Sequence, residues 1–187
     1  MVIPTDAAYA VACDAFKPDA TAALRAAKGR PPEAPLPVLI ANPGVVDALG
    51  YGVSAAGRDL AAALWPGPLT LLVRQQPSLL WDVDPGATVG ARMPLHPVAL
   101  ELLAATGPLA ATGANYSGMS VPLTCDDAEA QLGGAVAVYL DAGPMDPARA
   151  SAVVDASADP PRVLRTGSVD LDHLLRICPE LEVPQDG

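Results

Sequence analysis

The stretch ATVGARMPLHPVALELLAATGPLAAT (residues 87–112) shows the order of elements from which the fold class follows. Its first part, Ala87–Met93, is a short apolar run of the kind that forms a buried strand. Pro97 stands where a helix begins and Gly107 where it ends, which predicts a helix over Pro97–Thr106. A second short apolar run, Leu109–Thr112, follows directly. Strands and helices that alternate in this way favour an α/β or α+β fold around one mixed sheet.

The same alternation continues on both sides of this stretch. The further predicted strands are Val38–Ile40, Leu69–Val73, Val136–Leu140, Ala152–Asp155 and Arg162–Leu164. The further predicted helices are Pro18–Lys28, Ser54–Trp65, Asp126–Leu132 and Asp170–Ile177. Ser54 and Thr124 precede two of these helices as candidate N-caps. We find no linker and no repeat, so we expect a single α/β domain over residues 1–180 and a polar tail over 181–187.

Composition excludes several classes of protein. The chain has 187 residues, 51% of them hydrophobic, which excludes global disorder and fits one domain. A net charge of −10 opposes binding to the phosphate backbone, so we expect only weak or indirect contact with nucleic acid. Three widely spaced cysteines fit a reducing cytoplasm better than a disulfide framework. No run reaches the roughly 18 apolar residues of a membrane helix, so no membrane role is expected.

Several familiar site patterns are weak in this chain. Residues 50–55 (GYGVSA) match GxGxxA, but no strand leads directly into them, and we interpret them as a loop. Asp82 and Asp84 lie in a Pro/Gly turn, where we expect solvated carboxylates rather than cation ligands. His96 and His173 show no spacing typical of metal ligands, and we interpret both as surface or capping residues.

The basic residues carry more information because there are only 11 of them. Arg92 lies within an apolar strand, and a buried arginine is costly unless an anion pairs with it. Lys28 and Arg30 end a predicted helix, where cations also simply complement the helix dipole. Arg165 ends a predicted strand, and open α/β sheets bind ligands at strand ends. These residues alone predict a small phosphate- or carboxylate-bearing ligand.

Seven motifs in order resemble the YrdC-like threonylcarbamoyl-AMP synthase family. They are PTDAAYAV (4–11), KGRP (28–31) with PLPVL (35–39), WPGPLT (65–70), RMPLHP (92–97), TGANYSG (112–118), SAVVD (151–155) and RTG (165–167). The resemblance implies a single α/β domain with a twisted mixed sheet and a large concave ligand pocket. It implies a nucleotidyltransferase that converts L-threonine, bicarbonate and ATP into threonylcarbamoyl-AMP and pyrophosphate, a product used in tRNA modification.

The resemblance also implies roles for individual residues. Lys28 and Arg30 match the family's catalytic positions and, with Arg165, its contacts to the nucleotide phosphates. The further ATP contacts of the family match Thr88 and Asn115. The family's contacts to threonine match Arg92, which would hold the carboxylate, and Ser151. We therefore expect Arg92 to be buried and to face a pocket that it shares with Lys28, Arg30 and Arg165. Mg²⁺ is expected to arrive with ATP, not in a tightly bound protein site.

The chain departs from the family pattern mainly at hydroxyl-bearing positions. Ala7, Gly113, Val121 and Ala152 stand where the family has Thr or Ser. The chain begins at PTD, so we also expect the strand and helix that precede this motif in the family to be missing, through a truncated start or in a reduced paralogue. These differences leave three hypotheses open: a synthase with lowered turnover, a non-catalytic nucleotide- or RNA-binding paralogue, and a carbamoyl-adenylate enzyme with a different acceptor. For the first, we expect Ala7→Thr with Gly113→Ser to raise the threonine-dependent rate at least about tenfold.

Overall fold

A computed structural model describes residues 1–147 and 149–183 of the chain. The strands in this part are β1 Val2–Ile3, β2 Ala10–Asp14, β3 Val38–Leu39, β4 Gly50–Tyr51, β5 Leu69–Gln75, β6 Thr88–Arg92, β7 Leu109–Gly113, β8 Ala152–Asp155 and β9 Arg162–Arg165. The helices are α1 Pro18–Ala27, α2 Val46–Leu49, α3 Ala55–Leu64, α4 Pro97–Thr106, α5 Cys125–Leu132 and α6 Leu171–Ile177, with 3-10 turns at Pro43–Val45 and Gly133–Ala135.

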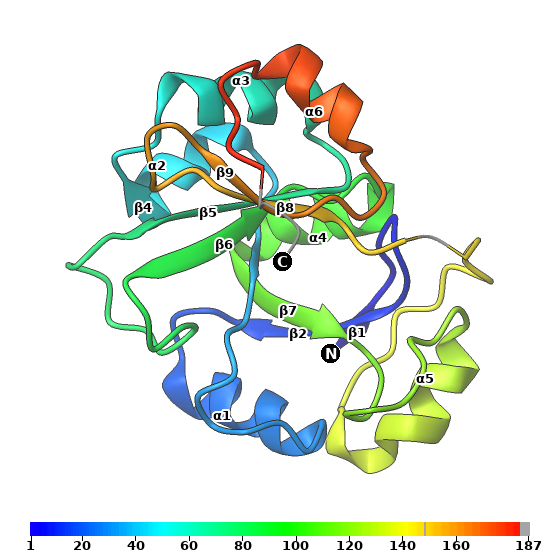
Figure 1. Ribbon diagram of the computed structural model, residues 1–187. Helices are drawn as coiled ribbons and strands as arrows, with labels where there is room; N and C mark the ends of the chain where they lie inside the picture. Colours follow the sequence, from blue (N-terminus) through cyan, green and yellow to red (C-terminus); the bar gives the residue numbers. More distant parts are fainter. Residues whose placement is uncertain (148, 184–187) are drawn as a thin grey trace.

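All the strands belong to one sheet, in the order β1-β2-β7-β3-β6-β5-β8-β9, with β4 paired to β5. The β3–β6 and β5–β8 pairs are parallel and the other pairs are antiparallel. Figure 1 shows α2, α3 and α6 gathered beside β5, β8 and β9, whereas α1 and α5 lie toward β1, β2 and β7. This arrangement confirms the predicted α/β fold with one mixed sheet.

Side chains of β5 point alternately into the hydrophobic core and into a cavity on the opposite face of the sheet, called the ligand face below. Leu69, Leu71 and Val73 are fully buried in the main hydrophobic core. The residues between them, Thr70 and Leu72, instead line a cavity. Successive side chains of a strand point to opposite faces, so every second residue of β5 serves the core and the others face the cavity. The neighbouring strand β6 follows the same rule.

The predicted signals at helix ends are confirmed. Ser54 Oγ accepts a hydrogen bond from the Gly57 backbone N–H at 3.1 Å, which caps α3. Thr124 Oγ1 accepts one from the Asp127 N–H at 3.1 Å, which caps α5. Each bond satisfies a backbone donor that the first turn of a helix leaves free. Helix α4 ends at Gly107, whose φ of 85° suits glycine.

The predicted strand Val136–Leu140 is wrong. In the structure this segment makes only an isolated bridge between Val2 and Tyr139. Its partner β1 is just two residues long, so the pairing cannot extend. At the other end of the chain, Leu181 is buried and Glu182 bridges to Arg162, while residues 184–187 of the predicted tail lie outside the described residues. No helix within the described ranges combines the length and apolarity needed to cross a membrane.

Candidate active site

A cavity of about 720 Å³ opens on the ligand face of the sheet. Its wall is largely apolar, formed by residues such as Leu36, Leu72 and Val153. Three cationic side chains, those of Arg30, Arg92 and Arg165, come from separate parts of the chain and also line it. A concave apolar site with a few convergent polar groups is the usual form of a small-molecule site. Three guanidinium groups select for an anionic ligand.

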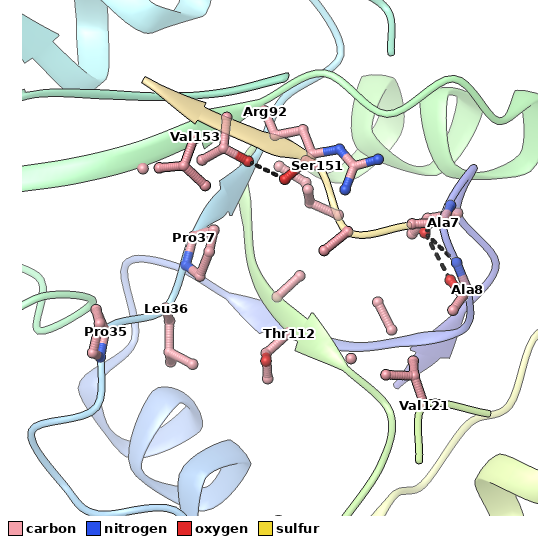
Figure 2. A pocket seen from close by; sticks show the side chains of 18 of the residues that line it. Ala7, Ala8, Pro35, Leu36, Pro37, Arg92, Thr112, Val121, Ser151 and Val153 are labelled. Carbon is pink, nitrogen blue, oxygen red and sulfur yellow. Dashed lines mark hydrogen bonds between the residues drawn. The ribbon is translucent and has the colours of Figure 1, made fainter. Parts of the chain in front are cut away.

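Arg92 ends β6 and points into this cavity. Its side chain is 12% exposed, and Nη2 donates to Asp6 Oδ2 at 2.7 Å. The Nε–H is buried and makes no hydrogen bond to the described residues. Figure 2 shows the guanidinium extending toward the Ala7–Ala8 turn, next to Asp6 in the chain. Arg92 is thus largely buried and shares the cavity with Arg30 and Arg165, whereas Lys28, which the prediction places in the same pocket, does not line it.

Lys28 and Arg30 flank the turn that follows α1. Lys28 is 3% exposed, and its ammonium donates to the carbonyls of Gly113 and Asn115. Burial, together with the charge of Arg30, lowers the pKa of Lys28 to about 8. Arg30 donates from Nη1 to Thr112 Oγ1 at 3.1 Å. Thus Lys28 lies behind the cavity wall, against the end of β7, whereas Arg30 lies in the wall itself.

Gly29 allows the two cations to stand so close together. Its φ is +63°, a left-handed conformation that favours glycine. A Cβ at this position would overlap the hydroxyl of Tyr116. Both observations favour glycine, and the resulting turn leaves Arg30 in the cavity wall while Lys28 stays buried.

Ser151, Arg165 and Thr70 form a hydrogen-bonded group on the cavity wall. Arg165 Nε donates to the Ser151 carbonyl at 3.0 Å, and the hydroxyls of Ser151 and Thr70 are 2.9 Å apart. Thr70 and Ser151 are both buried, and all three residues line the cavity. The hydroxyl of Ser151 is therefore held in one place. Sequence reasoning missed Thr70 because the spacing of residues does not show pairing across strands.

Two further predicted ligand residues lie outside the lining of the cavity. Asn115 donates from Nδ2 to the carbonyls of Tyr116 and Met119, at 3.0 and 2.9 Å, and so holds its own loop together. Thr88 starts β6, about 13 Å along the strand from Arg92 at about 3.3 Å per residue. The cavity therefore brings together Arg30, Arg92, Ser151 and Arg165, while Lys28, Asn115 and Thr88 are not part of its surface.

The substituted hydroxyl positions fall into two groups. Ala7, Gly113 and Val121 line the cavity, so the family's Thr or Ser at these positions would place a side chain at the cavity surface. Ala152 is fully buried in the main core. Its neighbours Ser151 and Val153 face the cavity, which places Ala152 on the opposite side of β8. Unlike the other three substituted positions, Ala152 does not face the cavity.

Arg25, which sequence reasoning missed, connects two loops of the cavity wall. It is buried, and Nε donates to the Ala34 carbonyl at 2.9 Å. Its Nη1 lies 3.3 Å from Asp82 Oδ2 and its Nη2 donates to the Asp82 carbonyl. Asp82 is exposed to solvent, as expected, but its carboxylate also pairs with Arg25. Asp84 lines the cavity and its Oδ1 also accepts from the Gly86 N–H, at 2.8 Å.

Residues 1–147 and 149–183 do not form a metal-binding site from their own side chains. They contain no group of three or more His, Cys, Asp or Glu side chains that could hold an ion. The three arginines suit an anion instead. A divalent cation that enters this cavity would therefore have to be held mainly by oxygen atoms of the anionic ligand that binds there.

Comparisons with known proteins agree with this geometry. The Sua5/YciO/YrdC family model, described as "Telomere recombination", matches residues 1–167. A Mycobacterium tuberculosis (strain H37Rv) protein, provisionally named a threonylcarbamoyl-AMP synthase, is 46% identical over 178 residues, covering 95% of this chain and 82% of that protein. The threonylcarbamoyl-AMP synthase of Bacillus subtilis is 33% identical over 186 residues, covering 98% of this chain and 54% of its own.

A solved structure shows the same fold. The crystal structure of Pyrococcus abyssi Sua5 complexed with L-threonine superposes with a TM-score of 0.90 at 29% identity, over 98% of this chain and 54% of that one. The present chain thus spans about half the length of that protein. The family match over most of the sequence and the shared fold lead to one conclusion: the chain belongs to the Sua5/YciO/YrdC family.

Proposed function

We propose that this protein is an L-threonylcarbamoyladenylate synthase, which forms threonylcarbamoyl-AMP and pyrophosphate from L-threonine, bicarbonate and ATP. The observation that carries the proposal is the single cavity in which Arg30, Arg92 and Arg165 meet the Ser151 hydroxyl on an apolar wall. This arrangement suits two anionic groups at once, a polyphosphate and an amino acid carboxylate. The names of the relatives point to the same reaction.

The reaction needs positioning and charge stabilisation more than a protein nucleophile. The threonine nitrogen takes up the carboxyl group of bicarbonate with loss of water, which gives a carbamate. A carbamate oxygen then attacks the α-phosphorus of ATP, the bond from that phosphorus to the bridging oxygen breaks, and pyrophosphate leaves. Cations fixed in the wall of the cavity stabilise the charge that develops on the phosphate oxygens. Mg²⁺ would enter with ATP, bound mainly by the phosphates.

The proposal assigns the predicted residues to two substrates, although Lys28, Thr88 and Asn115 lie outside the cavity lining. Lys28, Arg30 and Arg165, with Thr88 and Asn115, would serve ATP. Arg92 and Ser151 would serve threonine, since a planar guanidinium pairs with a carboxylate in two parallel hydrogen bonds. In this assignment the Lys28 ammonium exchanges a carbonyl partner for a phosphate oxygen when ATP binds.

The product would be consumed by a reaction that modifies tRNA, so tRNA is a partner of this chain only indirectly or weakly. We place the protein in the cytoplasm, where ATP and tRNA are available. The three cysteines, which are free in the structure, agree with a reducing compartment.

The test is a pyrophosphate-release assay with mass detection of the adenylate. We expect release only when L-threonine, bicarbonate and ATP are all present. Arg92→Lys should lower the threonine-dependent rate, whereas Arg58→Lys, in an exposed ion pair with Asp47, serves as the matched control. ATP binding without pyrophosphate release would overturn the proposal in favour of a non-catalytic nucleotide-binding protein. Release that needs another acceptor would reassign the enzyme to that acceptor.

A further inference from the structure

Arg92 already has an anionic partner within the protein. Asp6 Oδ2 accepts a hydrogen bond from Arg92 Nη2 at 2.7 Å, and each side chain of the pair is 12% exposed. The other carboxylate oxygen, Oδ1, accepts from the Leu95 backbone N–H at 3.1 Å. The Asp6 carboxylate is thus fixed to the end of β6 at two points and has little freedom to swing away.

Arg92 lines the cavity, whereas Asp6 does not. Asp6 therefore acts on a ligand only through Arg92. A guanidinium has five N–H donors in one plane, and the single bond to Asp6 leaves the others available. One of them, Nε–H, is buried without a partner among the described residues. Asp6 thus accepts one hydrogen bond from Nη2 and leaves the other N–H donors of Arg92 without a bond to Asp6.

The pairing also changes which anions the cavity attracts. A largely buried, unpaired guanidinium carries an uncompensated charge, which would attract any small anion from solution. Pairing with Asp6 cancels most of this charge but leaves directional N–H donors. A planar carboxylate can use two such donors at once, whereas a chloride ion gains mainly from net charge.

We propose that Asp6 is a positioning residue that gives the cavity its selectivity for a carboxylate: it orients the Arg92 guanidinium and offsets its charge, so that spherical anions such as chloride do not compete. The proposal rests on the proposed function where it assigns L-threonine as the carboxylate ligand. Its statement about the charge of Arg92 can be tested without that ligand.

The test compares the wild-type protein with Asp6→Asn, using chloride as the probe. Without substrate, chloride should raise the thermal midpoint of Asp6→Asn more than that of the wild type. By calorimetry, the affinity of Asp6→Asn for L-threonine should fall about tenfold from low to physiological chloride, and that of the wild type by much less. Asp47→Asn, which removes a carboxylate from a remote exposed ion pair, is the matched control for general salt effects.

The double variant Asp6→Asn with Arg92→Met assigns the effect to Arg92. It should lose the extra response to chloride, because the uncompensated charge is gone. If Asp6→Asn responds to chloride no more than Asp47→Asn does, the proposal is wrong. If Asp6→Asn folds only with chloride, or only when Arg92 is also replaced, the charge role is upheld. If the double variant also fails to fold, Asp6 is merely structural and the proposal fails. A wild type that binds no L-threonine would overturn the proposed function, while the chloride comparison would still decide the role of Asp6.

Discussion

Lys28 shows how one buried charge links the site to stability. Its ammonium is almost fully buried, and burial lowers its pKa from 10.5 to about 8. Below pH 8 the group is charged in both the folded and the unfolded state, so the cost of burying the charge is fully present. Between about pH 8 and 10.5 the unfolded state binds more protons than the folded state, and stability then rises with pH.

We therefore predict a pH-dependent difference between the wild type and Lys28→Met. Relative to Lys28→Met, the wild type should gain up to about 3 kcal/mol of unfolding free energy as pH rises from 8 to 10.5. Urea denaturation across this range measures the difference. Lys17→Met, which changes a side chain that is 73% exposed, is the control and should show no such trend. A difference for Lys28→Met that stays constant with pH would contradict the lowered pKa.

Gly113 changes the expectation for the lost hydroxyls. A Cβ at this position would lie 2.8 Å from Asn115 Oδ1 and 3.3 Å from Val121 Cγ1. Gly113→Ser must therefore displace an amide that is held by two backbone carbonyls. Ala7 lines the cavity and is half-buried, so a threonine there has more room. The structure thus separates two substitutions that the sequence treats alike.

We predict that Ala7→Thr alone raises the threonine-dependent rate at least about tenfold, since a hydrogen bond to a charged ligand contributes about 1.5–3 kcal/mol and each step of about 1.4 kcal/mol is a factor of ten. Gly113→Ser should instead lower the rate and destabilise the fold by about 1 kcal/mol, because Asn115 loses its partners. Pyrophosphate release and urea denaturation measure both effects. Gly134→Ser, at a glycine with open space around its Cβ position, is the matched control. Equal stability of Gly113→Ser and Gly134→Ser would refute the steric argument.

At the scale of elements, the cavity wall depends on the contact between two loops. Arg25, on α1, binds the Ala34 carbonyl in one loop and Asp82 in the other. The Leu36 N–H donates to the Val83 carbonyl at 2.7 Å and joins the same two loops. Arg30 and Asp84, which flank these contacts, both line the cavity. The Arg25–Asp82 pair therefore holds the wall that carries them.

We predict that Asp82→Asn destabilises the protein, although the Asp82 side chain is 44% exposed. The reason is that the Arg25 side chain, at 3% exposure, would keep its charge without a counterion. The double variant Asp82→Asn with Arg25→Met should recover part of the loss, because no buried charge is left over. Unfolding free energies of the three proteins test this. A double variant less stable than Asp82→Asn would contradict the charge argument.

At the scale of the whole molecule, a cationic cavity lies within a strongly acidic protein. The net charge is −10, yet three arginines converge on one cavity. A small anionic ligand can enter the cavity and meet those arginines at close range. A long polyanion such as tRNA must instead approach the acidic surface, where the net charge opposes it.

We predict that tRNA binds weakly and that its affinity falls steeply between low and physiological salt. ATP should bind with a smaller salt dependence, because partly buried charges are screened less than exposed ones. Fluorescence anisotropy with labelled tRNA, alongside calorimetry with ATP, measures both. Tight tRNA binding that does not change with salt would contradict the prediction.

Local sequence signals determined the fold class and the helix ends. Ser54, Thr124 and Pro97 act on backbone groups within a few residues of themselves, so their effect can be predicted without tertiary information. The strands β1, β2 and β4 were missed. β1 and β4 have only two residues each, which is too short to show a period, and β2 (Ala10–Asp14) contains two alanines, which are depleted in strands. Strands as short as β1 and β4 form because the longer strands β2 and β5 supply their hydrogen-bond partners. Residues 136–140 lie beside the two-residue strand β1 and have no longer strand to pair with.

Motif residues alone also indicated the family and the arginines of the cavity. Only the tertiary structure decided which side chains these arginines and the other residues of the site pair with. Asp6 lies 86 residues from Arg92, Asp82 lies 57 from Arg25, and Ser151 lies 81 from Thr70. Ala152 turns into the core because β8 pairs in register with β5, where Leu69 lies opposite it. Pairing across a sheet depends on which strands become neighbours and in which register, and these are properties of the folded chain that no local pattern contains.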